Sequence, residues 1–273
     1  MSLYTNFVEV TSSATWSTRS FHTSAVFDNK LWVMGGNDGA SFNDVWSSID
    51  GATWILATAS AAWSARQLHT SAVFDNKLWV MGGTSASTLN DVWSTTDGST
   101  WILATASAAW SGRYGPTSAV FDNKLWVMGG YDGTYFNDVW STTDGVTWIL
   151  ATSSAAWSAR HEHSSTVFDN KLWVMGGTPG STLNDVWSTT DGSTWILATS
   201  SAAWSTRQFH TSVVFDNKLW VVGGDNAGTY FDDVWSTTDG VTWTLVTASA
   251  AWSPRRAHTS AVFDNKLWVM GGT

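Results

Sequence analysis

The chain contains no cysteine, and only 3 of its 273 residues are proline. The absence of cysteine excludes disulfides and thiolate chemistry and leaves the redox compartment open. Basic residues are scarce, with 13 Lys and Arg against 22 Asp and Glu, and the net charge of -9 argues against nucleic acid as a partner. No apolar run approaches the roughly 18 residues of a membrane span. Residues 1–4 lack the basic and apolar regions of a signal peptide. We therefore expect a soluble chain with no membrane partner, whose localisation is unknown.

Repetition and tryptophan are what the chain has in abundance. It carries 22 Trp and 23 Gly, and a block of 47 residues is copied along it almost letter for letter. The spacings of the first Trp in each copy are 47, 47, 47, 47 and 48 residues, at Trp16, Trp63, Trp110, Trp157, Trp204 and Trp252. A fixed period of this size indicates a closed or stacked repeat architecture.

Each copy predicts four short antiparallel strands and no helix. In the second copy we expect them at residues 69–74, 77–81, 91–95 and 100–104. Asp75-Asn76 and Asp97-Gly98 are hairpin signals between strands. Such a sheet is apolar on both faces, so the copies must stack, and radial closure removes the exposed end faces.

Four apolar residues followed by Gly-Gly, as in Leu31–Gly36, and then two spaced aromatics, Trp46 and Trp54, resemble the kelch repeat. The match covers essentially the whole chain, although Trp46 replaces a Tyr and one extra residue precedes the second aromatic. The resemblance implies an all-β, six-bladed β-propeller of four-stranded antiparallel blades, similar to the galactose-oxidase-like propellers. The segment Ser94–Trp101 also resembles the Asp-box hairpin of sialidase-like propellers, which we interpret as a stable outer turn.

We expect one propeller domain over residues 1–273. Its blades are predicted at 16–62, 63–109, 110–156, 157–203, 204–251, and 252–273 plus 1–15. Phe7–Val10 aligns with the fourth strand at Trp54–Ala57, but nothing aligns with the third strand at 43–48. The sixth blade is therefore expected to be closed by an N-terminal strand and to be one strand short. Either that strand pairs directly with 267–270 or an open edge favours self-association, which a concentration-independent monomer mass would exclude.

The copies differ mainly after the repeated Arg and after Gly-Gly. Alternating strand directions place both stretches on one face of the disc and the Asp-Asn-Lys and Asp-Gly turns on the other. Random drift in loop sequences would spread the differences between copies over both faces of the disc. Here Tyr, Phe, His, Glu and Arg replace one another on one face, and such residues are typical of recognition surfaces. We call this surface the variable face. Its candidate ligand-binding residues are Arg19, Phe21, Asp38, Arg66, Leu68, Arg113, Tyr114, Tyr131, Asp132, Tyr135, Arg160, His161, Glu162, Arg207, Phe209, Asp225, Asn226, Tyr230, Arg255 and Arg256.

Two rings of repeated side chains have alternative interpretations. In the first interpretation, the Arg that recurs from Arg19 to Arg255 binds an acidic peptide, as arginines on this face of kelch-like proteins often do. In the second, each Arg pairs with a repeat Asp such as Asp44 and packs on Trp. The second interpretation is favoured, because a residue present in every copy usually belongs to the blade. The His that follows three residues later is favoured for hydrogen bonding between blades over a metal ring, because Pro116 interrupts the series.

Catalysis is not expected, and no cofactor or metal is predicted. The Cys-linked Tyr of the copper oxidases among kelch-like propellers is excluded, and a glycosidase would need a carboxylate pair, whereas Glu9 and Glu162 are the chain's two Glu. Tyr114 beside Glu162 is the nearest match to a sialidase-like nucleophile. His161-Glu162 is the best acid/base pair, although neighbours in a strand point to opposite sides.

Three functions remain open. The leading hypothesis is a non-enzymatic scaffold that binds a protein or peptide through the variable face. The second is a lectin-like module in which Tyr131, Tyr135 and Tyr230 stack on sugars. The third is a recently amplified or engineered repeat protein without a ligand, which the near-identity of the copies supports.

Overall fold

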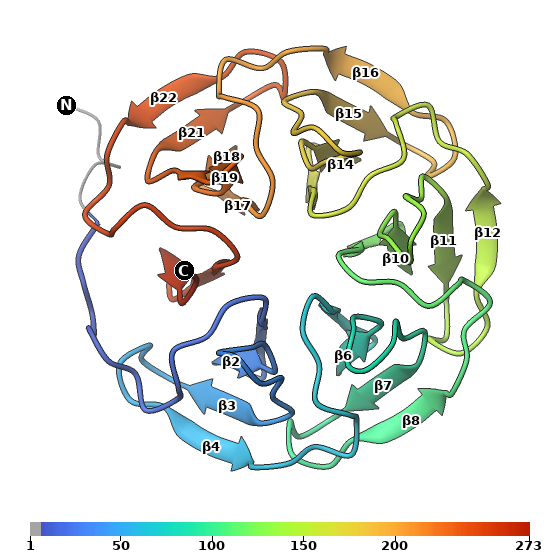
Figure 1. The fold of residues 1–273 in the computed structure, drawn as a ribbon, viewed down its shortest axis with the longest axis vertical. Helices are drawn as coiled ribbons and strands as arrows, with labels where there is room; N and C mark the ends of the chain where they lie inside the picture. Colours follow the sequence, from blue (N-terminus) through green and yellow to red (C-terminus); the bar gives the residue numbers. More distant parts are fainter. Residues whose placement is uncertain (1–6) are drawn as a thin grey trace.

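The computed structural model describes residues 7–273, which form six wedges of antiparallel strands around a central axis (Figure 1). Strands 4–5 residues long recur with the sequence period, and the described residues contain no helix. Residues 1–6, which we assigned to the sixth blade, lie outside the described residues. The all-β class and the propeller arrangement are therefore confirmed.

Each complete wedge is a four-stranded sheet whose strands follow chain order from the axis outward. The first strands are β1 Thr23–Phe27, β5 Thr70–Phe74, β9 Thr117–Phe121, β13 Ser164–Phe168, β17 Thr211–Phe215 and β23 Thr259–Phe263. The second strands are β2 Lys30–Met34, β6 Lys77–Met81, β10 Lys124–Met128, β14 Lys171–Met175, β18 Lys218–Val222 and β24 Lys266–Met270. The third strands are β3 Val45–Ser48, β7 Val92–Thr95, β11 Val139–Thr142, β15 Val186–Thr189 and β21 Val234–Thr237. The fourth strands are β4 Ile55–Thr58, β8 Ile102–Thr105, β12 Ile149–Thr152, β16 Ile196–Thr199 and β22 Thr244–Thr247. An additional hairpin, β19 Asp225–Asn226 with β20 Thr229–Tyr230, occupies the fifth copy's longer loop.

The turn residues explain the hairpin register. Asp28 and Asn29 take φ values of 49° and 53°, which these residue types tolerate. The two-residue turn pairs Phe27 with Lys30 and continues to Thr23 opposite Met34. Because the same turn recurs in every copy, each inner hairpin has the same register and presents the same residues to its neighbours.

Tryptophans join neighbouring wedges. One core cluster combines Trp32 and Val45 of the first wedge with Leu78 and Trp101 of the second. The buried Trp63 meets Trp101 edge to face, with ring centroids 5.8 Å apart. Each interface therefore depends on side chains from two copies, which explains why a single copy is not a self-sufficient fold.

The ring closes at its inner strands. β23 lies against both β17 and β1, and the hydroxyl of Thr259 is 3.1 Å from Nε2 of His22. Leu31 and Val33 share a core cluster with Ala261 and Met270. Six wedges thus surround the axis, and the chain does not form an open superhelix.

The sixth wedge is less complete than we expected. Within the described residues it contains β23 and β24 only, and residues 7–10 form no strand. The alignment of Phe7 was nevertheless correct in space, because Phe7 packs edge to face on Trp252, as Trp101 packs on Trp63. In the other wedges the fourth strand pairs with the third. Within residues 7–273 no third strand offers a ladder to the segment at Phe7, which packs through its side chain in place of the predicted closing strand.

Candidate binding face

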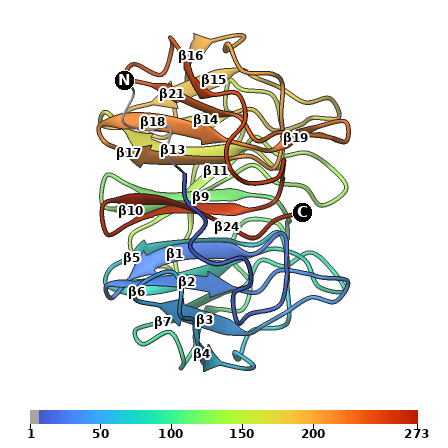
Figure 2. The ribbon, with the colours of Figure 1, turned by 90° about the vertical axis from the view of Figure 1, so that its left-hand side faces the viewer.

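The two variable stretches meet on one face of the disc. Ser20 and Asn37 exchange two backbone hydrogen bonds of 3.0 and 2.9 Å, and the same bridge joins Tyr114 to Tyr131 and Gln208 to Asp225. In the edge-on view, β19 marks this face on the right (Figure 2). The expected co-location of the two stretches is thus observed.

A closed ring of six backbone hydrogen bonds surrounds the axis at this face. Each N–H donates to the carbonyl oxygen of the equivalent residue in the preceding copy, over 2.9–3.1 Å, and Phe21 donates to Ala257 to complete the circle. The ring members are Phe21, Leu68, Gly115, Glu162, Phe209 and Ala257. All six take φ between 53° and 62°, and only one of them is glycine. The ring holds them in a conformation that Phe and Leu rarely adopt.

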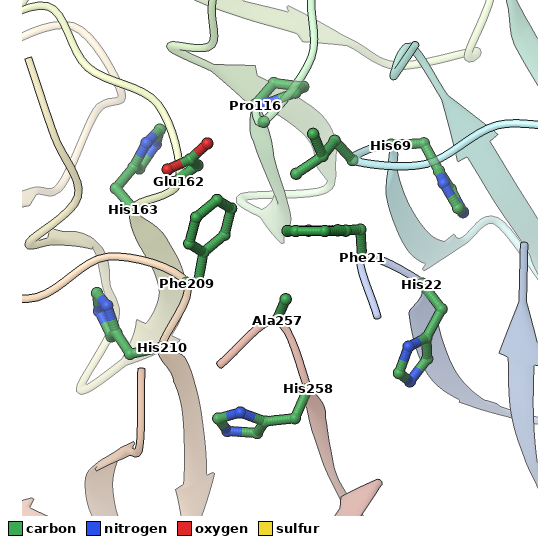
Figure 3. Close-up of a pocket in the computed structure, with 12 residues that line it drawn as sticks. Phe21, His22, His69, Pro116, Glu162, His163, Phe209, His210, Ala257 and His258 are labelled. Carbon is green, nitrogen blue, oxygen red and sulfur yellow. The ribbon is translucent and has the colours of Figure 1, made fainter. Parts of the chain in front are cut away.

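The ring residues form the mouth of an axial cavity of about 160 Å³. The rings of Phe21 and Phe209 lie near the centre of the opening and Glu162 lies at its edge, whereas the histidines lie farther out (Figure 3). The rings of Phe21 and Phe209 meet with centroids 5.2 Å apart. The opening is therefore narrowed by variable side chains.

Five of the six repeated arginines are internal to the blades. Arg66 donates from Nη1 to Asp91 Oδ1 at 2.8 Å and from Nη2 to Asp91 Oδ2 at 2.7 Å, and its side chain is 0% exposed. Its Nη1 also donates to the carbonyl of Gly82, and its guanidinium lies 5.7 Å from the Trp63 ring centroid. The equivalent pairs are Arg19–Asp44, Arg113–Asp138, Arg160–Asp185 and Arg207–Asp233. The interpretation as blade residues is therefore confirmed for these five, and their buried guanidinium groups are not presented to a ligand.

Arg255 and Arg256 differ from this pattern. Arg255 is half-buried and donates to the carbonyl of Gly271 and to Ser253, and the described residues offer it no carboxylate within ion-pair distance. Arg256 is on the variable face, where its Nη1 lies 3.5 Å from Asp225 Oδ1. Its guanidinium lies 5.3 Å from the Phe209 ring centroid and 5.2 Å from that of Tyr230. These three candidates and Arg256 form one cluster beside the mouth.

The histidines join blades. Nε2 of His69 lies 3.0 Å from the Thr23 hydroxyl of the preceding copy, and equivalent bonds involve His22, His163, His210 and His258. Burial, aided by Arg66, lowers the pKa of His69 to about 3, so the ring is neutral at ordinary pH. Where Pro116 replaces His, Thr70 bonds Ser118 instead, a compensation not visible in the sequence. No cluster of potential metal ligands occurs within residues 7–273.

A second cluster gathers the aromatic candidates of the third and fourth copies. The ring of Tyr131 lies 4.7 Å from that of Tyr135, 5.4 Å from that of Tyr114 and 5.4 Å from that of His161. His161 Nε2 lies 2.8 Å from Glu162 Oε1. Burial raises the pKa of Glu162, against the opposing effect of its bond with His161.

The contact between His161 and Glu162 corrects our expectation that these neighbours point apart. That expectation assumed an extended strand, but the positive φ of Glu162 turns its carboxylate back toward the imidazole. Burial and the nearby Tyr131 and Glu162 raise the pKa of Tyr114, which opposes its use as a phenolate nucleophile.

The remaining candidates are placed separately. Leu68 lines the axial cavity. Asp132 accepts a bond from the backbone N–H of Thr134, and Asp38 is exposed in the equivalent loop. Asn226 Oδ1 lies 2.7 Å from the hydroxyl of Thr182 in the neighbouring copy. The variable face therefore has two side-chain clusters and further loop residues whose side chains bond to other residues of this face.

The opposite face is built from repeated turns. Asp97 Oδ1 accepts bonds from the backbone N–H groups of Ser99 and Thr100, and the Thr95 hydroxyl accepts one from Gly98. The bonds from Thr100 and Ser99 hold the pKa of Asp97 below its usual range. The hairpin is thus a self-contained turn, as we interpreted the Asp-box-like segment.

Comparison with protein families gives two matches. The KLHDC2/KLHL20/DRC7 Kelch-repeats domain matches residues 69–272, and the Kelch motif matches residues 18–47. The chain belongs to the kelch-repeat family. Domains of this family generally serve as protein-interaction scaffolds and are generally not enzymes. No curated protein matches the chain significantly. Within the described part of this kelch-repeat chain, no helix is long and apolar enough to cross a membrane.

Proposed function

We propose that this kelch-repeat chain is a non-enzymatic module that binds a protein or peptide through its variable face. The observation that carries the proposal is the separation of repeated from exchanged residues. Repeated Arg, Asp, His and Trp side chains are bonded inside or between blades, whereas the exchanged residues line the axial mouth and its two clusters. Aromatic and Arg side chains gathered on one surface are typical of protein-binding sites.

The charges of the face favour a cationic segment as the ligand. Five arginines that would attract an acidic peptide are neutralised by their Asp partners. Asp38 and Asp132 remain exposed, and Tyr131 and Tyr135 offer aromatic surface. A Lys or Arg side chain can bind at the loop of the third copy by cation–π contact with Tyr131 or Tyr135 and by attraction to the carboxylate of Asp132.

A displayed random-peptide library tests this function. We expect enrichment of peptides containing basic residues, and we expect Tyr131→Ala to weaken the best of them at least about tenfold. Val146→Ser is the matched control, because Val146 is exposed in a turn of the opposite face. Failure to enrich any peptide, or equal binding by the Tyr131→Ala variant, would contradict the proposal.

A lectin-like function is the second candidate. The rings of Tyr131, Tyr135 and His161 lie tilted against one another in one cluster, and a sugar ring can pack on an aromatic face of the partly exposed Tyr131 or Tyr135. A glycan array distinguishes it from peptide binding: a signal lost in Tyr131→Ala, together with no enriched peptide, would favour sugar.

A further inference from the structure

The hydrogen-bonded ring at the axial mouth has one sector without a side chain. Phe21 and Phe209 are the ring neighbours of Ala257, and their aromatic rings meet with centroids 5.2 Å apart. Gly115 lies on the opposite side of the ring, where it bonds Leu68 and Glu162 through its backbone. A Cβ at Gly115 would lie 3.3 Å from the backbone nitrogen of Glu162, so glycine fits this position best. The mouth is therefore asymmetric, with its free sector in the third copy.

The free sector opens on a cavity whose wall is apolar apart from one carboxylate. Phe21, Leu68, Pro116 and Phe209 line it, and Glu162 is the one carboxylate among the lining residues. The histidines that also line it are bonded between blades. Figure 3 shows the Glu162 carboxylate at the edge of the opening, on the side of Pro116. The volume of about 160 Å³ is well above the roughly 10–15 Å³ that one water needs, so an extended side chain can enter.

His161 fixes the carboxylate and leaves one oxygen for a ligand. Its Nε2 lies 2.8 Å from Oε1 of Glu162, and its Nδ1 lies 3.3 Å from the carbonyl oxygen of Thr178. A guanidinium prefers to bind both oxygens of a carboxylate at once, whereas a compact ammonium can bind a single oxygen. The remaining Oε2 therefore favours the ammonium of Lys over the guanidinium of Arg.

The other charges near Glu162 balance each other. They belong to Asp225 and Arg256, whose Oδ1 and Nη1 lie 3.5 Å apart. Burial raises the pKa of Glu162, against the opposing effect of its bond with His161. An ammonium beside the carboxylate would favour its charged form and offset that effect of burial.

We propose that the axial cavity binds the side chain of a Lys residue in the peptide ligand. The ammonium donates to Oε2 of Glu162, and the methylene stem packs against Leu68 and the rings of Phe21 and Phe209. This inference rests on the proposed function and adds one ligand side chain with its position.

A titration with capped amino acids tests the cavity without a peptide library. The probe is Nα-acetyl-lysine methylamide, added to the isotope-labelled 273-residue chain and followed by NMR. We expect saturable shifts of the backbone amides of Gly115 and Glu162. The equally capped norleucine, which lacks the ammonium, and the capped Arg should each bind about tenfold more weakly or worse.

Glu162→Gln removes the charge and keeps the shape of the side chain. It should weaken binding of capped lysine about tenfold or more, while the remaining amide signals show that the fold is retained. Asp75→Asn is the matched control, because Asp75 is exposed in a turn of the opposite face and Asn tolerates its φ of 49°. This control should leave the affinity unchanged.

Three outcomes would overturn the inference. They are the absence of saturable shifts at Gly115 and Glu162, equal affinity for capped lysine and norleucine, and unchanged affinity in Glu162→Gln. Tighter binding of n-butylamine than of capped lysine would assign the cavity to a free amine and would overturn the peptide assignment. Library peptides that require Tyr131 but bind Glu162→Gln unchanged would support the proposed function and contradict this inference, so the two can fail separately.

Discussion

Arg66 lies in the blade interior and Arg256 lies on the variable face, and the two guanidinium groups have different environments. Arg66 is 0% exposed and bonds Asp91 in bidentate fashion. Arg256 is 29% exposed and lies 3.5 Å from Asp225 between two aromatic rings. Arg66 recurs in every copy, whereas the position of Arg256 holds Ser, Gln, Tyr or His elsewhere. The comparison teaches that the repeated Arg belongs to the bonded interior, whereas the exchanged residue that follows it lies at the variable face.

The largest expected effect on the interior is acid unfolding. The pKa values of His22, His69, His210 and His258 are lowered to about 3, and that of His163 is also well below its usual value. Their contribution to stability is complete above pH 6.5 and is lost as the pH falls toward 3, since the unfolded chain binds protons first. The pKa of Asp50 is lowered to about 2, so protonation of this carboxylate removes further stability below pH 4. Glu162 has the opposite effect, because its pKa is raised in the folded chain.

Urea titrations at several pH values measure this slope. Each proton contributes about 1.4 kcal/mol per pH unit to the free energy of unfolding, so five histidines should dominate the curve between pH 6 and 4. His69→Asn should reduce the slope by one proton. A flat profile over this range would contradict the burial of neutral histidines.

Removing one buried guanidinium is expected to have the next largest effect. Arg66→Met leaves Asp91 without its ion-pair partner and should lower the free energy of unfolding by about 3 kcal/mol. Arg256→Met is the surface counterpart and should cost less than about 1 kcal/mol. Equal losses in chemical denaturation would remove the distinction between the two regions.

Two glycines allow the packing of the two regions to be compared. A Cβ at Gly98 would overlap the Trp32 ring of the neighbouring blade, whereas nothing lies within 4 Å of one at Gly133 in a variable loop. Both residues have positive φ, 74° and 118°, so the backbone penalty is shared. Gly98→Ala should therefore destabilise by about 3 kcal/mol and Gly133→Ala by about 1 kcal/mol, measured by thermal denaturation.

The smallest expected change in stability comes from the aromatic cluster. Tyr131→Ala should change the free energy of unfolding by less than about 1 kcal/mol, because the ring lies on a partly exposed loop. A loss similar to that of Arg66→Met would show that the cluster belongs to the bonded interior.

Local patterns predicted the repeated part of the fold. The expected strand at 77–81 is observed as β6 Lys77–Met81, and that at 69–74 as β5 Thr70–Phe74. Turn chemistry and the 47-residue period sufficed because each copy repeats the same short-range information. The pairing of Arg66 with Asp91 was also predictable, because both recur in step along the chain.

Features that depend on closure of the ring could not be predicted. Phe21, Leu68 and Phe209 carry no sequence signal for positive φ, and the axial hydrogen-bond ring imposes it. The same conformation brings His161 and Glu162 into contact. In the sixth wedge the alignment placed Phe7 correctly, but strand formation depends on a neighbouring strand that residues 7–273 do not provide.

The most direct test compares the chain with a variant in which three residues of the third copy on the variable face are replaced by those of the second copy. We call this chain the levelled variant. Tyr114→Gln, Tyr131→Thr and Tyr135→Thr give the third copy the residues of the second, while Val146→Ser makes the equivalent exchange on the opposite face. Ligands selected on the parent chain should lose at least about tenfold in affinity for the levelled variant and bind the Val146→Ser control unchanged. Equal binding by the levelled variant, or loss confined to the Val146→Ser control, would contradict the claim that the exchanged residues form the binding surface.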